Sequence, residues 1–97
     1  LNMTRQECVT ILDGFYEIDN PPELMAIVQA RACVMHEDSD CPDKVFHSED
    51  EDRTVNLEYI QPWGSLVVEF FSDGDYFIYT ICNTQEEKVK TVKVYLS

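Results

Sequence analysis

Few residues of this chain have the types and spacing that catalysis requires. The chain has two histidines, His36 and His47, and neither has a partner at the His-Glu-x-x-His spacing of a zinc protease. No Ser lies in the Gly-x-Ser-x-Gly pattern of a hydrolase nucleophile. We therefore predict a non-catalytic protein without a cofactor, and we interpret both histidines as exposed loop residues.

Three closely spaced carboxylates, Asp38, Asp40 and Asp43, are the best candidate for a cation site. Oxygen ligands at short spacing are typical of calcium loops. The stretch lacks the Gly and the terminal Glu of an EF-hand loop, and Cys41 and Pro42 occupy positions where that loop places ligands. A solvated acidic loop is the simpler interpretation, with weak cation binding as the alternative, so we predict no metal site.

The cysteines Cys8, Cys33, Cys41 and Cys82 form an even set that is spread over the chain. None belongs to a Cys-x-x-Cys pair, which favours disulfides over metal ligation. A chain of 97 residues buries a modest core, which covalent links would stabilise. We favour pairing Cys8 with Cys82, which would tie an N-terminal helix to the sheet, and Cys33 with Cys41, which would clip an acidic loop.

Other features indicate the secretory route. Asn2, Met3 and Thr4 form a glycosylation sequon, and the chain begins at Leu1, as a processed protein would. With the predicted disulfides, these features predict a secreted, extracellular glycoprotein. No stretch approaches the ~18 to 20 apolar residues of a membrane span. No linker-like stretch divides residues 1–97, so we predict one domain.

The charge is strongly acidic, with 19 Asp and Glu against 7 Lys and Arg. A net charge of −12 would repel a phosphate backbone, which excludes nucleic-acid binding. The acid is concentrated in residues 37–52, which we predict to be a loop held down by Cys41. This charge serves solubility alone, or it steers a basic partner to the domain. The residues predicted to steer are Glu49, Asp50, Glu51 and Asp52.

Helices are expected in the first third of the chain. Thr4 and Glu7 form a capping-box pattern, and apolar residues then recur at helical spacing as far as Gly14. Residues 21–35 fit a helix with Asn20 as its N-cap, although their apolar residues also alternate as in a long strand. We favour the helix.

The rest of the chain predicts an antiparallel four-stranded meander over residues 53–96. The expected strands, rich in Val, Ile, Phe and Tyr, are 54–60, 65–72, 75–82 and 88–96. Asp73-Gly74 is the signal of a type I′ hairpin turn. Apolar residues occur on both faces of the sheet, so the second face must be covered by the helices, by the rest of a barrel or by a partner.

The aromatic residues suggest where a ligand would bind. Trp63 lies in a predicted turn, where it either anchors a recognition surface or closes one end of the core. Aromatic faces beside carboxylates suit cationic ligands. The residues predicted to line the ligand site are Tyr59, Trp63, Phe70, Phe77 and Tyr79.

Two short motifs resemble known families. The run Gly14-Phe15-Tyr16-Glu17-Ile18 resembles the start of the first barrel strand of lipocalins, and the C-terminal strands resemble their closing strands. This resemblance implies a small calycin-like β-barrel that carries a small ligand, with a disulfide between the N-terminal segment and a late strand. Residues 59–64 are similar to the Pro-Trp hairpin of cystatins, which implies cysteine-protease inhibition as a lesser option.

Together the patterns predict a β-rich α+β domain, in which one or two N-terminal helices and two disulfides accompany the meander. A small calycin-like barrel is the alternative fold. We predict a secreted binding protein that captures a small or peptide-like extracellular ligand, cationic or amphipathic. The alternative is an interaction or inhibitory module whose acidic surface docks on a basic partner protein. A closed cavity would favour the former function, and a filled core with exposed aromatics the latter.

Overall fold

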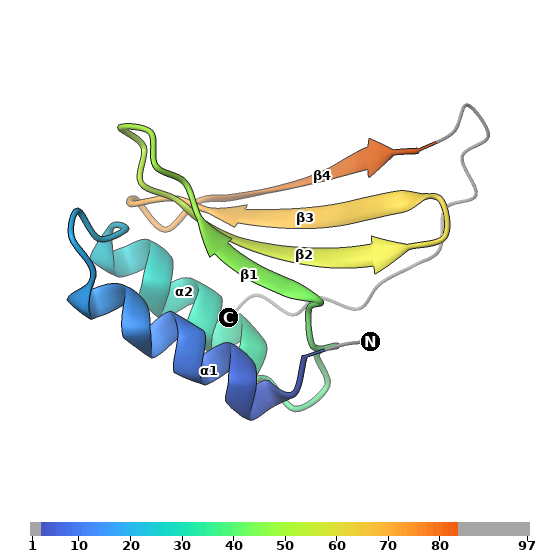
Figure 1. Ribbon diagram of the computed structural model, residues 1–97, viewed down its shortest axis with the longest axis horizontal. Helices are drawn as coiled ribbons and strands as arrows, with labels where there is room; N and C mark the ends of the chain where they lie inside the picture. Colours follow the sequence, from blue (N-terminus) through green and yellow to red (C-terminus); the bar gives the residue numbers. More distant parts are fainter. Residues whose placement is uncertain (1–2, 84–97) are drawn as a thin grey trace.

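A computed structural model describes residues 3–83, in which two helices pack against one face of a four-stranded antiparallel sheet (Figure 1). Neither of these described helices is long and apolar enough to cross a membrane. The predicted strand 88–96 and the sequon residue Asn2 lie outside the described residues. The elements are α1 (Arg5–Gly14), a 3-10 turn η1 (Phe15–Glu17), α2 (Leu24–Met35), β1 (Lys44–His47), β2 (Val55–Gln61), β3 (Gly64–Phe70) and β4 (Tyr76–Cys82).

The first helix begins and ends where the sequence predicts. The Thr4 hydroxyl accepts a hydrogen bond from the Glu7 amide at 3.1 Å, and the Glu7 carboxylate accepts one from the Thr4 amide at 2.9 Å. This capping box satisfies two amides that a helix start otherwise leaves unpaired. After Gly14 the chain continues as the 3-10 turn, so the segment expected as the first barrel strand is helical instead.

Residues 24–35 form a helix, which confirms that interpretation over the strand. Its N-cap is Glu23, however, and the prediction that Asn20 caps it is wrong. Asn20 adopts a left-handed conformation with φ of 53°, which Asn tolerates better than most residues. The helix starts late because Pro22 disfavours helical geometry at the preceding residue, Pro21.

The sheet is a meander in the order β1-β2-β3-β4, and three of its strands match predicted ones within two residues. The first strand lies within residues 37–52, which were predicted to be a loop, and that prediction is wrong for residues 44–47. β1 is only four residues long, and only two of them, Val45 and His47, turn toward the helices. Because this alternation is so short, the sequence does not predict the strand. Within residues 3–83 no strand joins β4 to β1, so the sheet is open rather than a closed barrel.

The turn between β3 and β4 also differs from its prediction. The Gly74 amide donates to the Phe71 carbonyl at 3.2 Å, and Gly74 has a positive φ of 88° while Asp73 does not. A type I′ turn needs positive φ at both central residues. Phe71 and Gly74 instead close a turn whose central residues, Ser72 and Asp73, both lack a positive φ, so the type I′ prediction is wrong.

The core lies between the helices and the sheet. The helices contact β1, β2 and β3 and leave the adjacent face of β4 uncovered (Figure 1). Tyr59 and Phe70 are both 2% exposed within this core. The fully buried apolar side chains at its centre are Cys8, Leu12, Ala26, Ala30, Cys33, Val34, Val55, Leu57 and Val68.

The loop between α2 and β1 is held by hydrogen bonds. Arg5 of α1 donates to the carbonyls of Val34, of His36 at 2.8 Å and of Ser39 at 3.3 Å. The Tyr59 hydroxyl donates to the Asp40 carbonyl at 3.2 Å. These bonds anchor the segment that Cys41 was expected to clip.

No disulfide is found among residues 3–83, which include all four cysteines. The predicted pairs of Cys8 with Cys82 and of Cys33 with Cys41 are therefore absent. Cys8 lies on α1, which packs against β1, whereas Cys82 ends β4 on the far side of β2 and β3. Strands are about 4.8 Å apart, so this separation exceeds the reach of a disulfide.

Candidate functional site

Within residues 3–83 the strand β4 is the most unusual surface, because all seven of its side chains are exposed although most are large and apolar. Phe77, Tyr79 and Ile81 point to the outer face of the sheet, away from the helices. Their exposed fractions are 63%, 40% and 52%. Three adjacent apolar side chains on one strand form a surface of the kind that mediates binding.

Two carboxylates lie on the same outer face as this apolar row. Residues directly opposite in an antiparallel pair share a face, which places Glu69 beside Phe77 in one row, and Glu58, Val67 and Tyr79 in the next. The Thr54 hydroxyl donates to Glu69 Oε2 at 2.6 Å, and the Ser65 hydroxyl donates to Glu58 Oε2 at 2.9 Å. Each carboxylate is thus held in place and keeps further acceptor sites.

The electrostatic effect of these carboxylates reaches the aromatic row. Burial raises the pKa of Tyr79, and the charges of Glu69 and Glu58 raise it further, because they oppose a second negative charge nearby. A cation at this position would be attracted by the same charges and by the faces of the aromatic rings. We refer to Glu58, Glu69, Phe77, Tyr79 and Ile81 as the outer-face surface.

The residues predicted to line one ligand site are separated by the fold. Tyr59 and Phe70 turn toward the helices and belong to the core. Trp63 lies in the turn between β2 and β3 and is 7% exposed, so it is no exposed anchor. Phe77 and Tyr79 alone remain together as exposed side chains, on an outer face where Val67 and Asn56 are buried.

The predicted steering residues 49–52 form the loop between β1 and β2, where all four are exposed. The Asp52 amide donates to Asp50 Oδ1 at 3.0 Å, which shapes the loop locally. The β3–β4 turn, with Asp73 and Asp75, lies at the same end of the sheet, because Val55, Phe70 and Tyr76 are in register (Figure 1). Six carboxylates therefore gather at the end where β4 begins.

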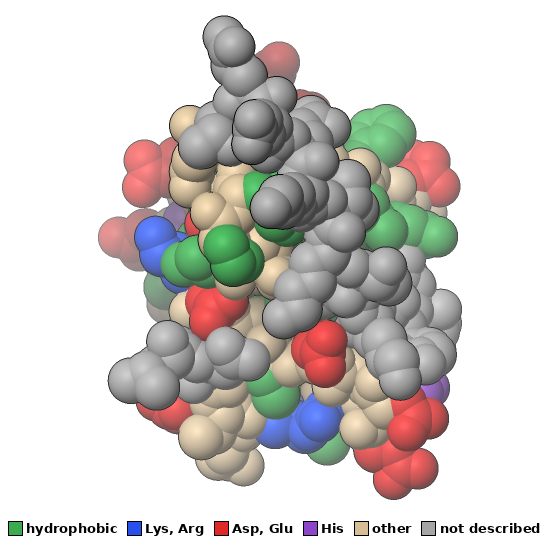
Figure 2. All heavy atoms as spheres, turned by 90° about the vertical axis from the view of Figure 1, so that its right-hand side faces the viewer, with side chains coloured by type: hydrophobic (Ala, Val, Ile, Leu, Met, Phe, Trp, Pro, Cys, Tyr) green, Lys and Arg blue, Asp and Glu red, His purple; other side chains and the backbone are tan. Residues whose placement is uncertain are grey.

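Acidic side chains also border the opposite end of the molecule. Figure 2 looks onto the end where β2 and β4 terminate, and among the described residues Asp and Glu outnumber Lys and Arg there. The field around the described part of the chain is thus negative on more than one side.

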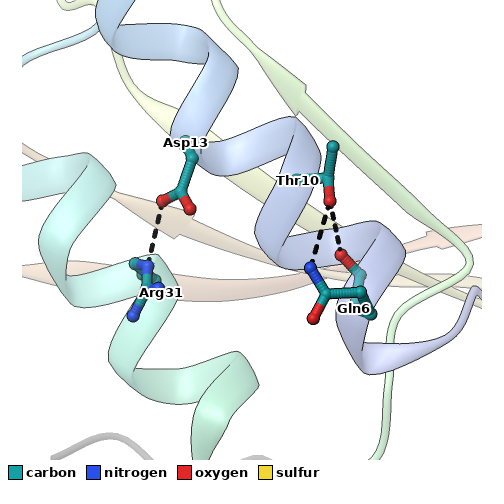
Figure 3. A network of polar contacts seen from close by, with 4 residues as sticks. All are labelled: Gln6, Thr10, Asp13 and Arg31. Carbon is teal, nitrogen blue, oxygen red and sulfur yellow. Dashed lines mark hydrogen bonds and ion pairs between the residues drawn. The ribbon is translucent and has the colours of Figure 1, made fainter.

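A groove between α1 and α2 is the main alternative site. It has a volume of about 460 Å³ and is lined by Arg5, Gln6, Val9, Asp13, Arg31 and Met35. Arg31 Nε lies 3.0 Å from Asp13 Oδ1, and Gln6 bonds to Thr10 (Figure 3). The polar side chains labelled in Figure 3 already bond to one another, so this groove offers no unpaired polar group among them to bind a ligand.

The histidines and the Asp38 region carry no comparable arrangement. His47 is half-buried on β1 and packs edge-on against Phe15 at 5.1 Å, so the expectation that it is an exposed loop residue is wrong. Asp43 Oδ2 accepts the Ile60 amide at 2.7 Å. Within residues 3–83 no three His, Cys, Asp or Glu residues are grouped so that they could hold a metal ion.

Sequence reasoning missed Glu58, Glu69 and Ile81. All three lie at alternate positions of predicted strands, on the face shared by Phe77 and Tyr79. Strand alternation was the signal that could have grouped them. When the chain is compared with models of protein families, with curated proteins and with solved structures, no match is found.

Proposed function

We propose that this chain is a non-catalytic binding protein that takes a cationic, peptide-like segment of a partner protein on its outer-face surface. The observation that carries the proposal is the exposed row Phe77, Tyr79 and Ile81 beside the oriented carboxylates of Glu58 and Glu69. Aromatic rings supply contact area at low entropy cost, and the carboxylates select for Lys or Arg.

The packing supports a surface interaction over capture in a cavity. Tyr59 and Phe70 would have lined a pocket, but both are packed in the core. The described sheet is open, whereas a carrier of small ligands encloses them in a barrel or cleft. Of the two functions that the sequence predicts, docking on a basic partner therefore agrees better with the arrangement of the aromatic residues.

The acidic ends of the sheet suit the same role. Glu49, Asp50, Glu51 and Asp52 are exposed near the start of β4, and their field would increase the rate at which a basic partner arrives. Secretion and a glycan on Asn2 remain predictions from the sequence, and they would place the partner outside the cell.

A matched pair of substitutions on β4 tests the proposal. Phe77→Ser removes an apolar side chain from the outer face, and Tyr76→Ser removes one that is also exposed but points to the opposite face. Binding of a fluorescent short peptide in which Lys alternates with Val is measured by anisotropy, with a Glu-Val peptide as the charge control. We expect Phe77→Ser to weaken binding by about tenfold or more and Tyr76→Ser to change it little.

Two results would contradict the proposal. Equal peptide affinities of the two variants would show that the outer face does not contribute to binding. Equal binding of the Lys-Val and Glu-Val peptides would show that the carboxylates do not select a cation.

A further inference from the structure

The strand β4 is also an edge, since β3 pairs with one side of it and no strand within residues 3–83 pairs with the other (Figure 1). An edge strand presents a row of amide and carbonyl groups that can pair with another chain. Proteins usually protect such an edge with charges, prolines, bulges or a covering element. β4 has the sequence Tyr-Phe-Ile-Tyr-Thr-Ile-Cys, without a charge or a proline, and it pairs with β3 without a bulge.

The hydrogen-bond pattern shows which residues face the open edge. The Phe71 amide donates to the Asp75 carbonyl at 2.9 Å, and the Asn83 amide donates to the Trp63 carbonyl at 2.8 Å. Bonded and non-bonded pairs alternate along an antiparallel ladder. Phe77 and Tyr79 therefore bond inward to β3, whereas Ile78 and Thr80 direct their N–H and C=O groups to the open edge.

The charges around this edge determine whether an acidic or a basic segment can bind there. Residues 64–82 contain three carboxylates, those of Glu69, Asp73 and Asp75, and no Lys or Arg. The described basic residues lie elsewhere, on α1, α2, β1 and the β1–β2 loop. A second copy of this chain, with its net charge of −12, would be repelled, while a basic strand would be attracted.

We propose that β4 binds its partner by strand addition, with a basic, Val- or Ile-rich segment pairing with Ile78 and Thr80 along the open edge. This inference rests on the proposed function and specifies its geometry. Main-chain bonds to the edge supply affinity, as in other cases of strand addition. Alternate side chains of the added strand lie beside Phe77 and Tyr79 on the outer face, and Glu69, two strands away on β3, is within reach of Lys or Arg.

Two other occupants of the edge are outcomes of the test. Residues 88–96, which the sequence predicts to be the next strand of the meander, contain Lys88, Lys90 and Lys93 among Val residues and thus have the same chemistry as the proposed partner segment. A second copy of the chain is the other.

Amide hydrogen exchange of the full chain distinguishes these cases. In the free protein we expect Ile78 and Thr80 to exchange quickly while Phe77 and Tyr79, which bond to β3, exchange slowly. At a Lys-Val peptide concentration ten times its Kd, exchange of Ile78 and Thr80 should slow by about tenfold, because only the free fraction exchanges. The Glu-Val peptide should give no protection.

Three results would overturn strand addition. Slow exchange of Ile78 and Thr80 in the dilute free chain would show that residues 88–96 already occupy the edge. Protection that rises with protein concentration alone would show pairing of two copies. Peptide binding that leaves Ile78 and Thr80 unprotected would refute the edge geometry while the proposed function stands, whereas a lack of any peptide binding would refute both.

A backbone variant supplies a second test. Thr80→Pro removes an outward N–H but no bond to β3, while Thr80→Ala keeps that N–H and serves as the control. We expect Thr80→Pro to weaken peptide binding about five- to tenfold relative to Thr80→Ala. Equal affinities of the two folded variants would contradict the proposal, and if Thr80→Pro does not fold, the exchange measurement decides.

Discussion

At the residue scale, Gly64 is the position where substitution is least tolerated. Its φ is 148°, and a Cβ there would lie 1.8 Å from the Ile81 carbonyl oxygen on β4. We predict that Gly64→Ala lowers the free energy of unfolding by roughly 3 kcal/mol or more, because backbone atoms must separate. Gly14→Ala is the control, since Gly14 is helical with φ of −65° and nothing lies within 4 Å of the added Cβ.

Urea unfolding of the two alanine variants measures the difference. Gly14→Ala should be neutral or stabilising by up to about 1 kcal/mol. Equal stabilities would mean that β3 and β4 are not in the described register.

The buried thiols predict a loss of stability at high pH. Burial raises the pKa of both Cys8 and Cys33 from 9.0 to about 11. Between these values the unfolded chain releases thiol protons that the folded chain keeps, so stability is full below pH 9 and falls as the pH rises toward about 11. The double variant Cys8→Ala/Cys33→Ala should show a shallower decline in unfolding free energy over this range.

Alkylation of the unreduced protein provides the complementary readout. Cys82 is exposed and should react quickly, whereas Cys8 and Cys33 should react slowly until the protein unfolds. Failure of all four cysteines to react even after unfolding would indicate the disulfides that the sequence predicts.

At the scale of elements, Arg5 links the two helices to the loop that follows them. Arg5→Met keeps much of the side-chain stem but removes the donors to three carbonyls. We therefore predict that it lowers the free energy of unfolding by about 2 to 4 kcal/mol. Arg31→Met removes only an ion pair to Asp13 whose side chains are 42% and 49% exposed, and should cost less than about 1 kcal/mol. Thermal unfolding of both variants tests this ranking, and similar losses would contradict the role assigned to Arg5.

Elements with strong local signals were predictable from the sequence. The Thr4–Glu7 capping box fixed the start of α1, and Val, Ile, Phe and Tyr runs located β2, β3 and β4. The four-residue β1 was not predictable, because its pairing with β2 comes from tertiary packing around Val45 rather than from a pattern. The start of α2 was misplaced because Asn20 before proline is typical of a helix start, whereas Pro22 disfavours helical geometry at Pro21 and moves the N-cap to Glu23.

At the scale of the whole molecule, the charge distribution predicts fast, salt-sensitive association. Replacing Glu49, Asp50, Glu51 and Asp52 by Gln or Asn should slow association with the Lys-Val peptide at low salt and change dissociation little. Glu37, Asp38 and Asp40 are exposed at the other end of the sheet. Neutralising them should slow association with the peptide less, for each charge removed, than neutralising residues 49–52.

Stopped-flow kinetics at two ionic strengths separate steering from solubility. Rate constants equal to those of the unmodified protein at low salt would mean that the 49–52 loop serves only solubility. Faster dissociation would instead indicate direct, desolvated contacts between the loop and the peptide.

The candidate site was predictable only in part, because it depends on which face each side chain occupies. Phe77 and Tyr79 were predicted, and their alternation placed them on one face. Tyr59 and Phe70 are also aromatic residues of predicted strands, but the helices cover the face on which they lie. The packing of α2 on β2 and β3 determines which face is covered, and the sequence does not show this packing. Glu58 and Glu69 lie beside the aromatic row only because of the register between neighbouring strands, which the sequence of one strand does not determine.

The most direct test of the account is an NMR map of the full chain with the Lys-Val peptide. We predict that the largest chemical-shift changes occur at Glu69, Phe77, Tyr79 and Ile81 on the outer face and at the edge residues Ile78 and Thr80, and that they disappear with the Glu-Val peptide. Residues of the α1–α2 groove, such as Gln6 and Asp13, should not change. Shift changes confined to that groove, or no change anywhere at saturating peptide, would contradict the assignment of the outer face as the binding surface.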